Sequence, residues 1–313
     1  MVSTRSAARR ALGGMSTRLS PAAAKAGPPL RRQHKRAARR DTRRSAASQA
    51  SQAGSPGSPA AAPPSPPAAA AEEELALETL DARASLKQGM RQLEQRLQAE
   101  GHACIVGVDE AGRGPLCGPV VAGACHIPLD VTIEGIDDSK ELSEPQREAA
   151  YEALTTHPRV RWAVAECDHA TIDEINILQA TMLAMRNAVA SLAGEGDAPD
   201  AVLVDGNRRP WGNPEGKQAK GGIRPADPPP PAGLRKCIAV IKGDGHVRAI
   251  AAASVLAKVH RDRVMQQLAV QYPEYGMEGH KGYPSAAHKA AVAKHGPSPV
   301  HRLTFRGVKE HVR

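Results

Sequence analysis

Two adjacent carboxylates stand between an apolar run and a glycine-rich turn. The apolar run is Ile105–Val108, the acids are Asp109 and Glu110, and the turn is Gly112–Gly114. A buried strand can deliver such acids to a divalent metal ion, and a turn flanked by glycines lets its own backbone approach a ligand closely. The order of these three features favours a site that handles a phosphate backbone.

Two further acids follow apolar runs that predict buried strands. Asp205 ends the run Ala201–Val204, and Asp244 follows the run Cys237–Ile241 after a Lys-Gly pair. Acids also end strands as ordinary turn formers, so each of them alone would say little. Carboxylates at three strand ends, with no histidine or cysteine partner, together indicate a site for an oxygen-preferring cation. We expect Mg²⁺ or Mn²⁺ there and not Zn²⁺.

Such a cation site indicates hydrolysis of a phosphodiester. Two metal ions can activate a water molecule and stabilise the leaving oxygen during in-line attack. The sequence shows no serine nucleophile with a paired histidine, so direct attack by water is the expected reaction. Adjacent residues of a strand point to opposite faces, so Asp109 and Glu110 can share a site only if the chain bends or Glu110 reaches around.

Hydrophobic spacing predicts the elements that must position these acids. Five strands are expected, over 104–108, 120–127, 160–166, 201–205 and 237–241. Helices are expected within 72–100, and over 172–192, 250–271 and 286–294. Thr171 and Asp173 offer capping oxygens for the second of these, and Gly194 ends it. The expected fold class is α/β, with a mixed sheet flanked by helices, antiparallel first and then parallel.

Residues 1–71 differ in composition from the rest of the chain. They are mostly Ala, Arg, Ser, Pro and Gly and carry 13 Lys and Arg against one acid, a net charge of +12, whereas the whole chain has +9. Residues 72–313 therefore have a net charge of −3. A segment of this kind cannot bury enough apolar surface to offset the entropy of ordering, so we expect a disordered tail at 1–71 and a catalytic domain at 72–313.

Three interpretations of the basic tail stay open: a tether for nucleic acid, a transit peptide, or a solvated extension with no specific task. Met15 is an alternative start. The five cysteines form no Cys-x-x-Cys pair, which argues against a disulfide framework and a zinc site and for a reducing compartment. No apolar run is long enough to span a membrane, so no transmembrane helix is expected. We expect the protein to be cytoplasmic and a monomer.

Residues 103–306 resemble the ribonuclease HII family, which is the type 2 ribonuclease H family. Seven motifs carry the resemblance, in this order: Gly107–Leu116, Asp138–Lys140, Asp173–Asn176, Val204–Asn207, Lys242–Asp244, Ala252–Asp262 and His280–Pro284. So many ordered motifs make the resemblance specific. It does not cover the basic tail, and the loop at 208–235 looks longer and richer in proline than is usual for the family.

The resemblance implies a ribonuclease H-like fold with a C-terminal helical extension. It implies cleavage of the RNA strand of RNA/DNA hybrids and incision 5′ to ribonucleotides embedded in duplex DNA, leaving 5′-phosphate and 3′-hydroxyl ends. The implied metal ligands are the four carboxylates Asp109, Glu110, Asp205 and Asp244.

The resemblance also implies that the backbone of Gly112, Arg113 and Gly114 reads the 2′-hydroxyl, and that the Tyr283 ring packs on the sugar beside the RNA–DNA junction. The 2′-hydroxyl both donates and accepts hydrogen bonds, so the backbone groups of a turn suit it.

Three lysines and a serine are candidates for holding backbone phosphates: Lys140, Lys242, Ser254 and Lys258. The alternatives are solvated lysines and a serine on a helix surface. Asp262 lies four residues after Lys258, a spacing that favours an ion pair along a helix. We expect His280 and His288 to be loop and helix-surface residues and not ligands.

Two other functions stay open beside an active ribonuclease HII. One is a catalytically silent binder of RNA/DNA hybrids, against which the four carboxylates argue. The other is an enzyme like ribonuclease HIII, which shares the fold. The Lys281-Gly282-Tyr283 motif and the compositionally biased tail favour ribonuclease HII.

Overall fold

The computed structural model describes residues 75–85, 90–136, 142–194, 196–212 and 228–312, which belong to one compact unit. The expected tail at 1–71, Lys140 and the middle of the 208–235 loop lie outside these residues. The strands are β1 Ala76–Asp81, β2 Ile105–Ala111, β3 Val120–His126, β4 Arg161–Cys167, β5 Ala201–Asp205 and β6 Lys236–Ile241. The helices up to the last strand are α1 Ala82–Ser85, α2 Gln92–Ala99, α3 Glu144–Thr156, α4 His169–Ile175 and α5 Ile177–Ala193. After it come η1 Gly243–Gly245, α6 Arg248–Gln271, η2 Pro273–Tyr275, α7 Met277–His280, α8 Ala286–His295 and η3 Lys309–His311.

The six strands form one mixed sheet in the order β1-β6-β5-β2-β3-β4. Strands β2, β3 and β4 are antiparallel neighbours, whereas β2, β5, β6 and β1 run parallel. The connection between β2 and β3 is short, which suits an antiparallel pair, and the parallel strands are joined by longer connections that include helices. The expected mixed α/β sheet is therefore confirmed.

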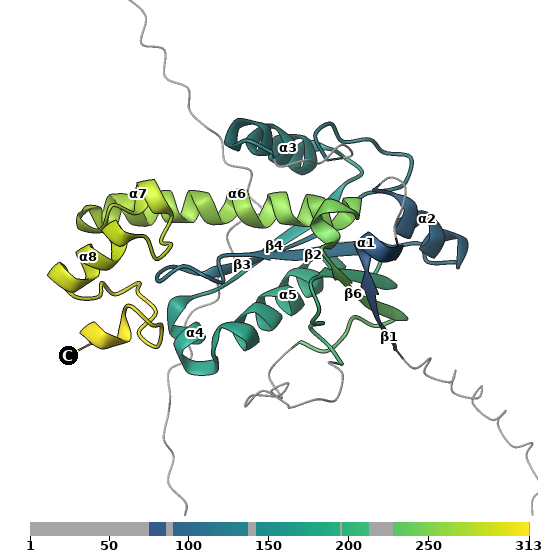
Figure 1. Ribbon diagram of the computed structural model, residues 1–313. Coiled ribbons are helices and arrows are strands. Elements are labelled where there is room, and N and C mark those ends of the chain that lie inside the picture. The colour runs from purple at the N-terminus through teal and green to yellow at the C-terminus, as the bar shows by residue number, and fades with distance from the viewer. Residues whose placement is uncertain (1–74, 86–89, 137–141, 195, 213–227, 313) are drawn as a thin grey trace, which may run out of the picture. The chain divides into compact units, whose positions relative to one another are not determined.

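Helices cover both faces of the sheet (Figure 1). Helix α5 packs on one face, where its apolar side chains meet Val106, Val108 and Ala122. Helices α6 and α3 lie on the other face and share a second apolar cluster. Burial of these two stripes against the sheet supplies the hydrophobic driving force for the fold.

Two glycines let helix α6 lie directly against the sheet. A Cβ atom at Gly107 of β2 would stand 2.1 Å from the carbonyl carbon of Ala249, and one at Gly123 of β3 would stand 2.4 Å from the carbonyl oxygen of Ala253. No side chain fits in these gaps. The close approach brings the middle of α6 beside the end of β2, where Asp109 lies.

A C-terminal extension, residues 272–312, packs beside the second half of α6 (Figure 1). It encloses the β2–β3 connection from two sides. Gly118 N donates to Val300 O at 2.9 Å, and Leu116 N donates to Gly282 O at 2.8 Å. Cys117 also forms an isolated antiparallel bridge with His301. The turn after the two adjacent acids is thus held by residues far away in the sequence.

Two expectations about elements are wrong. Residues 76–81 form strand β1 and not a helix, because their backbone pairs in register with β6 at the edge of the sheet. The single helix expected over 172–192 is broken at Asn176, whose φ is 70°. Asp168 caps α4 and Asn176 caps α5, so neither Thr171 nor Asp173 is the capping residue.

All five cysteines are free and buried. None of the helices in the described part is both long and apolar enough to cross a membrane.

Candidate active site

Asp109 lies near the end of β2 with only 7% of its surface exposed. Its side chain accepts a hydrogen bond from the Ser254 hydroxyl of α6 and one from the backbone N–H of Glu110, the latter at 2.7 Å. Burial raises the pKa of Asp109 well above its usual value, and the nearby carboxylates of Glu110 and Asp205 raise it further. The fold thus places a carboxylate where its negative charge is costly.

Glu110 is the next residue of the strand and is also largely enclosed, with 13% of its side chain exposed. Its Oε1 accepts a hydrogen bond from the Arg113 guanidinium at 3.0 Å. Burial raises the pKa of Glu110 and Asp205 adds to the rise, while the positive charge of Arg113 opposes it. The glycine turn therefore folds its own arginine back toward the paired acids.

Asp205 ends β5, the parallel neighbour of β2. Its Oδ1 accepts hydrogen bonds from the backbone N–H groups of Gly243 at 2.8 Å and Asp244 at 3.2 Å. Burial raises the pKa of Asp205, and the carboxylate of Asp244 raises it further. The side chain of Asp244 is exposed in the short helix η1. The ends of β2, β5 and β6 thus bring four acids into one group whose charges repel one another.

The donor set of this group fits a hard divalent cation. Every candidate ligand is a carboxylate oxygen, which Mg²⁺ and Mn²⁺ prefer. Burial raises the pKa values of Asp109, Glu110 and Asp205, and repulsion between neighbouring carboxylates adds to the rise, so the group is unfavourable when all its members are ionised. A bound cation would offset that repulsion and hold the carboxylates in their charged form.

The glycine turn follows directly after the acids, and its first glycine has no room for a side chain. Gly112 has φ +97°, and a Cβ atom there would stand 2.1 Å from Nε of Arg261. Gly114 is exposed, and its side faces Tyr283, whose Cε1 would be 3.6 Å from a Cβ atom at position 114. Tyr283 is 44% exposed, and the Arg261 guanidinium carbon lies 5.9 Å from the centre of its ring. Two motifs far apart in the sequence therefore meet at one surface.

The phosphate-holding candidates are placed differently from one another. Ser254 is hydrogen-bonded to Asp109, as described above. Lys258 forms an ion pair with Asp262 at 2.8 Å, as the spacing along the helix predicts. Lys242 is exposed next to Asp244, in a left-handed conformation with φ 60°. Lys140 lies outside the described residues.

Sequence reasoning missed two fully buried arginines. Arg302 binds backbone carbonyls of the turn and of the segment after it, and Arg261 binds carbonyls of Cys117, Pro119 and Lys281. Neither stands in a run of acids or at a spacing that indicates a site. The one available signal was the place of Arg261 within the motif Ala252–Asp262, and Arg302 had no such signal.

The expectation that His288 lies on a helix surface is wrong, because His288 is fully buried. Its donor atom and those of Cys117 and His301 lie within 4.8 Å of one another, a grouping that could in principle hold a metal ion. The hydrogen bonds favour another explanation. His288 Nδ1 lies 3.0 Å from the carbonyl oxygen of Tyr283 and must donate to it, whereas His301 Nδ1 accepts from Ser298 N at 3.0 Å.

These assignments leave the proton of His301 on Nε2, from which it donates to Nε2 of His288 at 3.0 Å. Every ring nitrogen then has a partner without a metal ion. Burial lowers the pKa of both imidazoles, to about 4 for His301, so the pair is neutral at pH 7. We therefore describe it as a hydrogen-bonded chain that reaches the backbone of Tyr283.

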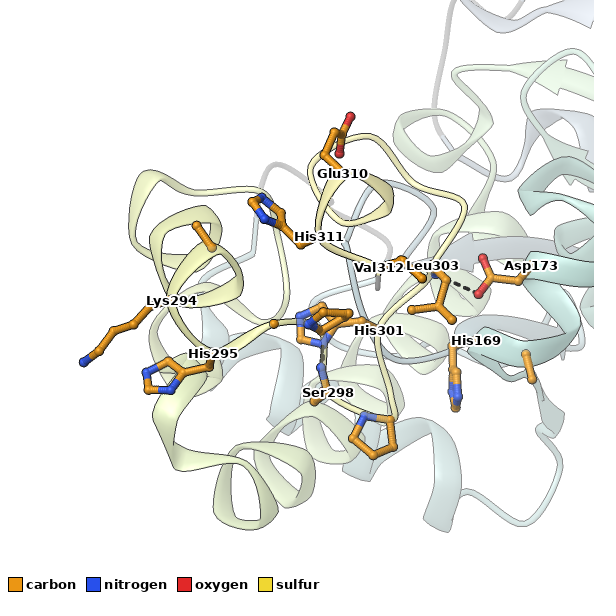
Figure 2. A pocket seen from close by; sticks show the side chains of 15 residues that line it. His169, Asp173, Lys294, His295, Ser298, His301, Leu303, Glu310, His311 and Val312 are labelled. Atoms are coloured by element: carbon orange, nitrogen blue, oxygen red, sulfur yellow. Dashed lines mark hydrogen bonds between the residues drawn. The ribbon is translucent and has the colours of Figure 1, made fainter.

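A cavity of about 940 Å³ lies between α4 and the C-terminal extension. Figure 2 shows its lining side chains, with Asp173 pointing toward the backbone of Leu303 and His301 toward Ser298. The Asp173 carboxylate accepts hydrogen bonds from the N–H groups of Leu303 at 2.7 Å and Thr304 at 2.9 Å. None of the four carboxylates of the candidate active site lines this cavity, so the two are separate.

Comparison with known proteins identifies the family. Residues 106–308 match the profile of the family described as Ribonuclease HII. The Ribonuclease HII of Geobacter sulfurreducens is 45% identical over 219 residues, which cover 70% of this chain and 89% of that protein. The Ribonuclease HII of Dechloromonas aromatica is 48% identical over 201 residues, which cover 64% of this chain and 90% of that protein.

Among solved structures, Bst-RNase HIII in complex with Mn²⁺ superposes with a TM-score of 0.50 at 18% identity, covering 67% of this chain and 69% of that one. This likeness shows the fold. The profile match and the two curated relatives show the family, and the expectation drawn from the motifs is confirmed. The chain belongs to the ribonuclease HII family of metal-dependent ribonucleases H.

Proposed function

We propose that this protein is an endoribonuclease with two related activities. It hydrolyses the RNA strand of RNA/DNA hybrids, and it incises duplex DNA on the 5′ side of an embedded ribonucleotide. In both reactions water attacks the phosphorus and the bond to the 3′-oxygen breaks. The products carry a 5′-phosphate and a 3′-hydroxyl.

One observation supports this function above the others. The glycine turn and Tyr283 share a surface directly beside the four carboxylates, with Gly114 next to the tyrosine ring. A backbone turn that can donate and accept hydrogen bonds suits a 2′-hydroxyl, and an exposed ring suits the sugar beside it. Recognition of a ribonucleotide and cleavage of its phosphodiester would then take place at neighbouring points.

The residues of this chain would divide the work as follows. Asp109, Glu110, Asp205 and Asp244 would hold Mg²⁺ or Mn²⁺, which when bound activates the attacking water and stabilises the leaving oxygen. The Ser254 hydroxyl fixes the orientation of Asp109, and the N–H groups of the Gly243 turn fix that of Asp205. Preorganised ligands of this kind do not have to reorient when the substrate binds.

Cations near the site would orient the substrate backbone. Lys242 and Arg113 are exposed beside the acids and can contact phosphates from the solvent side. Lys258 would have to leave or share Asp262 to do the same. Lys140 stays a candidate from the sequence alone.

The test is a cleavage assay on an end-labelled DNA duplex that carries one ribonucleotide, with Mg²⁺, Mn²⁺ or a chelator. We expect one metal-dependent cut immediately 5′ to the ribonucleotide, and cleavage of a long RNA/DNA hybrid in parallel. Cutting of the long hybrid without the single-site incision would indicate a specificity like that of ribonuclease HIII. Binding without cleavage of either substrate would indicate a silent hybrid binder.

A further inference from the structure

Arg302 places a complete guanidinium group against the inner side of the glycine turn. The residue is fully buried, and its five N–H donors meet five backbone carbonyls. Their distances run from 2.7 Å to 3.1 Å, and the acceptors are the carbonyl oxygens of Gly112, Arg113, Pro115, Gly118 and Pro119. A charged donor makes each of these bonds stronger than a neutral one would be.

Because the peptide group is planar, the contact with Arg302 also fixes the direction of the N–H groups on the other side of the turn. The C=O and N–H of one peptide unit lie in a plane and point in opposite directions. The carbonyl of Gly112 shares its peptide with the N–H of Arg113, and the carbonyl of Arg113 shares its peptide with the N–H of Gly114. Because Arg302 draws both carbonyls inward, both N–H groups point away from it.

These two N–H groups are available to a ligand. Within the described part of the chain, neither the Arg113 N–H nor the Gly114 N–H donates to a protein acceptor. Both residues are exposed, and Gly114 stands beside the ring of Tyr283. The turn thus presents two unused donors at the surface where a ribonucleotide would lie.

We propose that Arg302 is a positioning residue for ribonucleotide specificity: it orients the turn so that the N–H groups of Arg113 and Gly114 face the substrate's 2′-hydroxyl. The inference rests on the proposed function and deepens it. Arg302 itself touches no substrate.

Arg261 does not duplicate this role. It holds the carbonyls of Cys117, Pro119 and Lys281, which lie at the base of the turn and beside Tyr283. Of Arg261 and Arg302, only Arg302 reaches the carbonyls of Gly112 and Arg113. Burial lowers the pKa of Arg302 to about 9, so the group is still cationic at pH 7.

The first experiment compares Arg302→Lys with the wild type in Mg²⁺. Lysine keeps the charge but cannot reproduce the five N–H donors that the planar guanidinium group holds in fixed directions. The half-saturating concentration in single-turnover incision is measured for the duplex with one ribonucleotide, and the inhibition constant is measured for an all-DNA duplex of the same sequence. We expect the half-saturating concentration for the ribonucleotide duplex to rise about tenfold, because binding of this duplex depends on the 2′-hydroxyl. The inhibition constant of the all-DNA duplex should change less than about twofold.

Arg248→Lys is the matched control. Arg248 is also fully buried, and it donates to the carbonyls of Val131, Ile127 and Pro128, far along the sheet from the turn. This variant should lose thermal stability in the same way and leave both constants as in the wild type. An equal change of both constants in Arg302→Lys would show a merely structural role, and no change in either would also overturn the proposal.

A second measurement needs no variant, in case Arg302→Lys does not fold. In the isotope-labelled wild type with chelator, the amide signals of Arg113 and Gly114 should shift when the ribonucleotide duplex is added and shift less with the all-DNA duplex. Identical shifts with both duplexes would overturn the proposal. The proposed function has its own test. If the wild type does not incise the ribonucleotide duplex, the proposed function is wrong, whatever the amide shifts of Arg113 and Gly114 show.

Discussion

At the scale of single residues, the site is built from charges that the fold makes unfavourable. Asp109 is buried beside Glu110 and Asp205, and the pKa of each of the three is raised by burial and by the others or by Asp244. A cluster of this kind lowers the stability of the chain at neutral pH when no cation is bound. A bound divalent cation would therefore stabilise the folded chain at this cluster.

Replacing Asp109 by asparagine should separate catalysis from stability. Asp109→Asn keeps the shape of the side chain but removes the charge that holds the cation, so we expect cleavage to fall at least about 100-fold. The thermal unfolding midpoint in chelator should be equal to or above that of the wild type, because an unfavourable buried charge has been removed. Steady-state kinetics and a melting curve measure the two effects.

The pH dependence gives this prediction its control. A carboxyl group whose pKa is raised by folding binds its proton more tightly in the folded state, so it lowers stability as pH rises from its unfolded pKa to its folded pKa. Without metal, the midpoint of Asp109→Asn should therefore exceed that of the wild type by more at pH 8 than at pH 4. A difference in midpoint between the two proteins that stays constant from pH 4 to pH 8 would mean that folding does not raise the pKa of Asp109.

Tyr283 should affect one substrate more than the other. Its ring is 44% exposed beside Gly114, where it can pack on a sugar. We expect Tyr283→Ala to reduce incision at a single ribonucleotide by roughly tenfold more than cleavage of a long hybrid, and Tyr283→Phe to keep most of the wild-type ratio. Equal losses of kcat/KM on both substrates would contradict a role at the RNA–DNA junction.

At the scale of elements, three separate parts of the fold constrain the turn after β2. Helix α6 approaches the sheet through Gly107 and Gly123, and Arg261 on that helix fills the space beside Gly112. The C-terminal extension then closes over the turn from the other side. The conformation of the turn depends on helix, sheet and extension together.

The two glycines of the turn should respond very differently to alanine. At Gly112 a Cβ atom would stand 2.1 Å from Nε of Arg261 and 2.9 Å from the Pro119 carbonyl, and φ is +97°, so Gly112→Ala should cost roughly 2–5 kcal/mol of unfolding free energy. Gly114→Ala makes only an ordinary contact with Tyr283 and should leave stability nearly unchanged. Chemical denaturation measures the free energy of unfolding of both variants. Similar losses in the two variants would show that the turn can rearrange to accommodate a Cβ atom at Gly112.

The spacing of apolar residues was enough to predict most of the elements. Strands β2 to β6 and helices α6 and α8 lie within a few residues of where their periodicity places them. Strand β1 could not be predicted, because its leucines also fit a helix and only pairing with β6 decides between the two. The break at Asn176 depends on a single left-handed residue that periodicity does not register.

The candidate site could be predicted only in part. Acids at strand ends and a glycine turn are local signals, and the structure brings Asp109, Glu110, Asp205 and Asp244 close enough for their charges to interact. The supporting residues leave no such signal. Arg302 lies 190 positions from Gly112, so its bond to that carbonyl exists only after the sheet and the C-terminal extension have assembled.

At the scale of the whole molecule, charge is divided unequally along the chain. Residues 72–313 carry a net charge of −3 and the acids of the candidate site, whereas residues 1–71 carry +12. We propose that the C-terminal part is the catalytic domain and that the basic part strengthens attraction to nucleic acid without reading its sequence. Counterion release from the phosphates is the expected source of that attraction.

Deleting residues 1–71 should change binding and leave folding alone. The melting temperature and the kcat for incision should match those of the full chain. The slope of log affinity against log salt concentration should become shallower, by about 0.9 for each phosphate that the basic segment neutralised. Titrations at several salt concentrations measure this, and a large drop in melting temperature would contradict the proposed division into tail and domain.

The burial of all five cysteines has a practical consequence. Thiolates are the reactive form, and burial raises the pKa of Cys117 to about 11 and those of Cys125 and Cys237 to about 12. A thiol reagent can therefore modify the folded chain only when some part of it opens. Cys117 lies between the turn and the C-terminal extension, whereas Cys125 and Cys237 lie in the sheet. The rate at which Cys117 reacts would therefore report how often the extension separates from the turn. The rates at which Cys125 and Cys237 react would report how often the sheet opens.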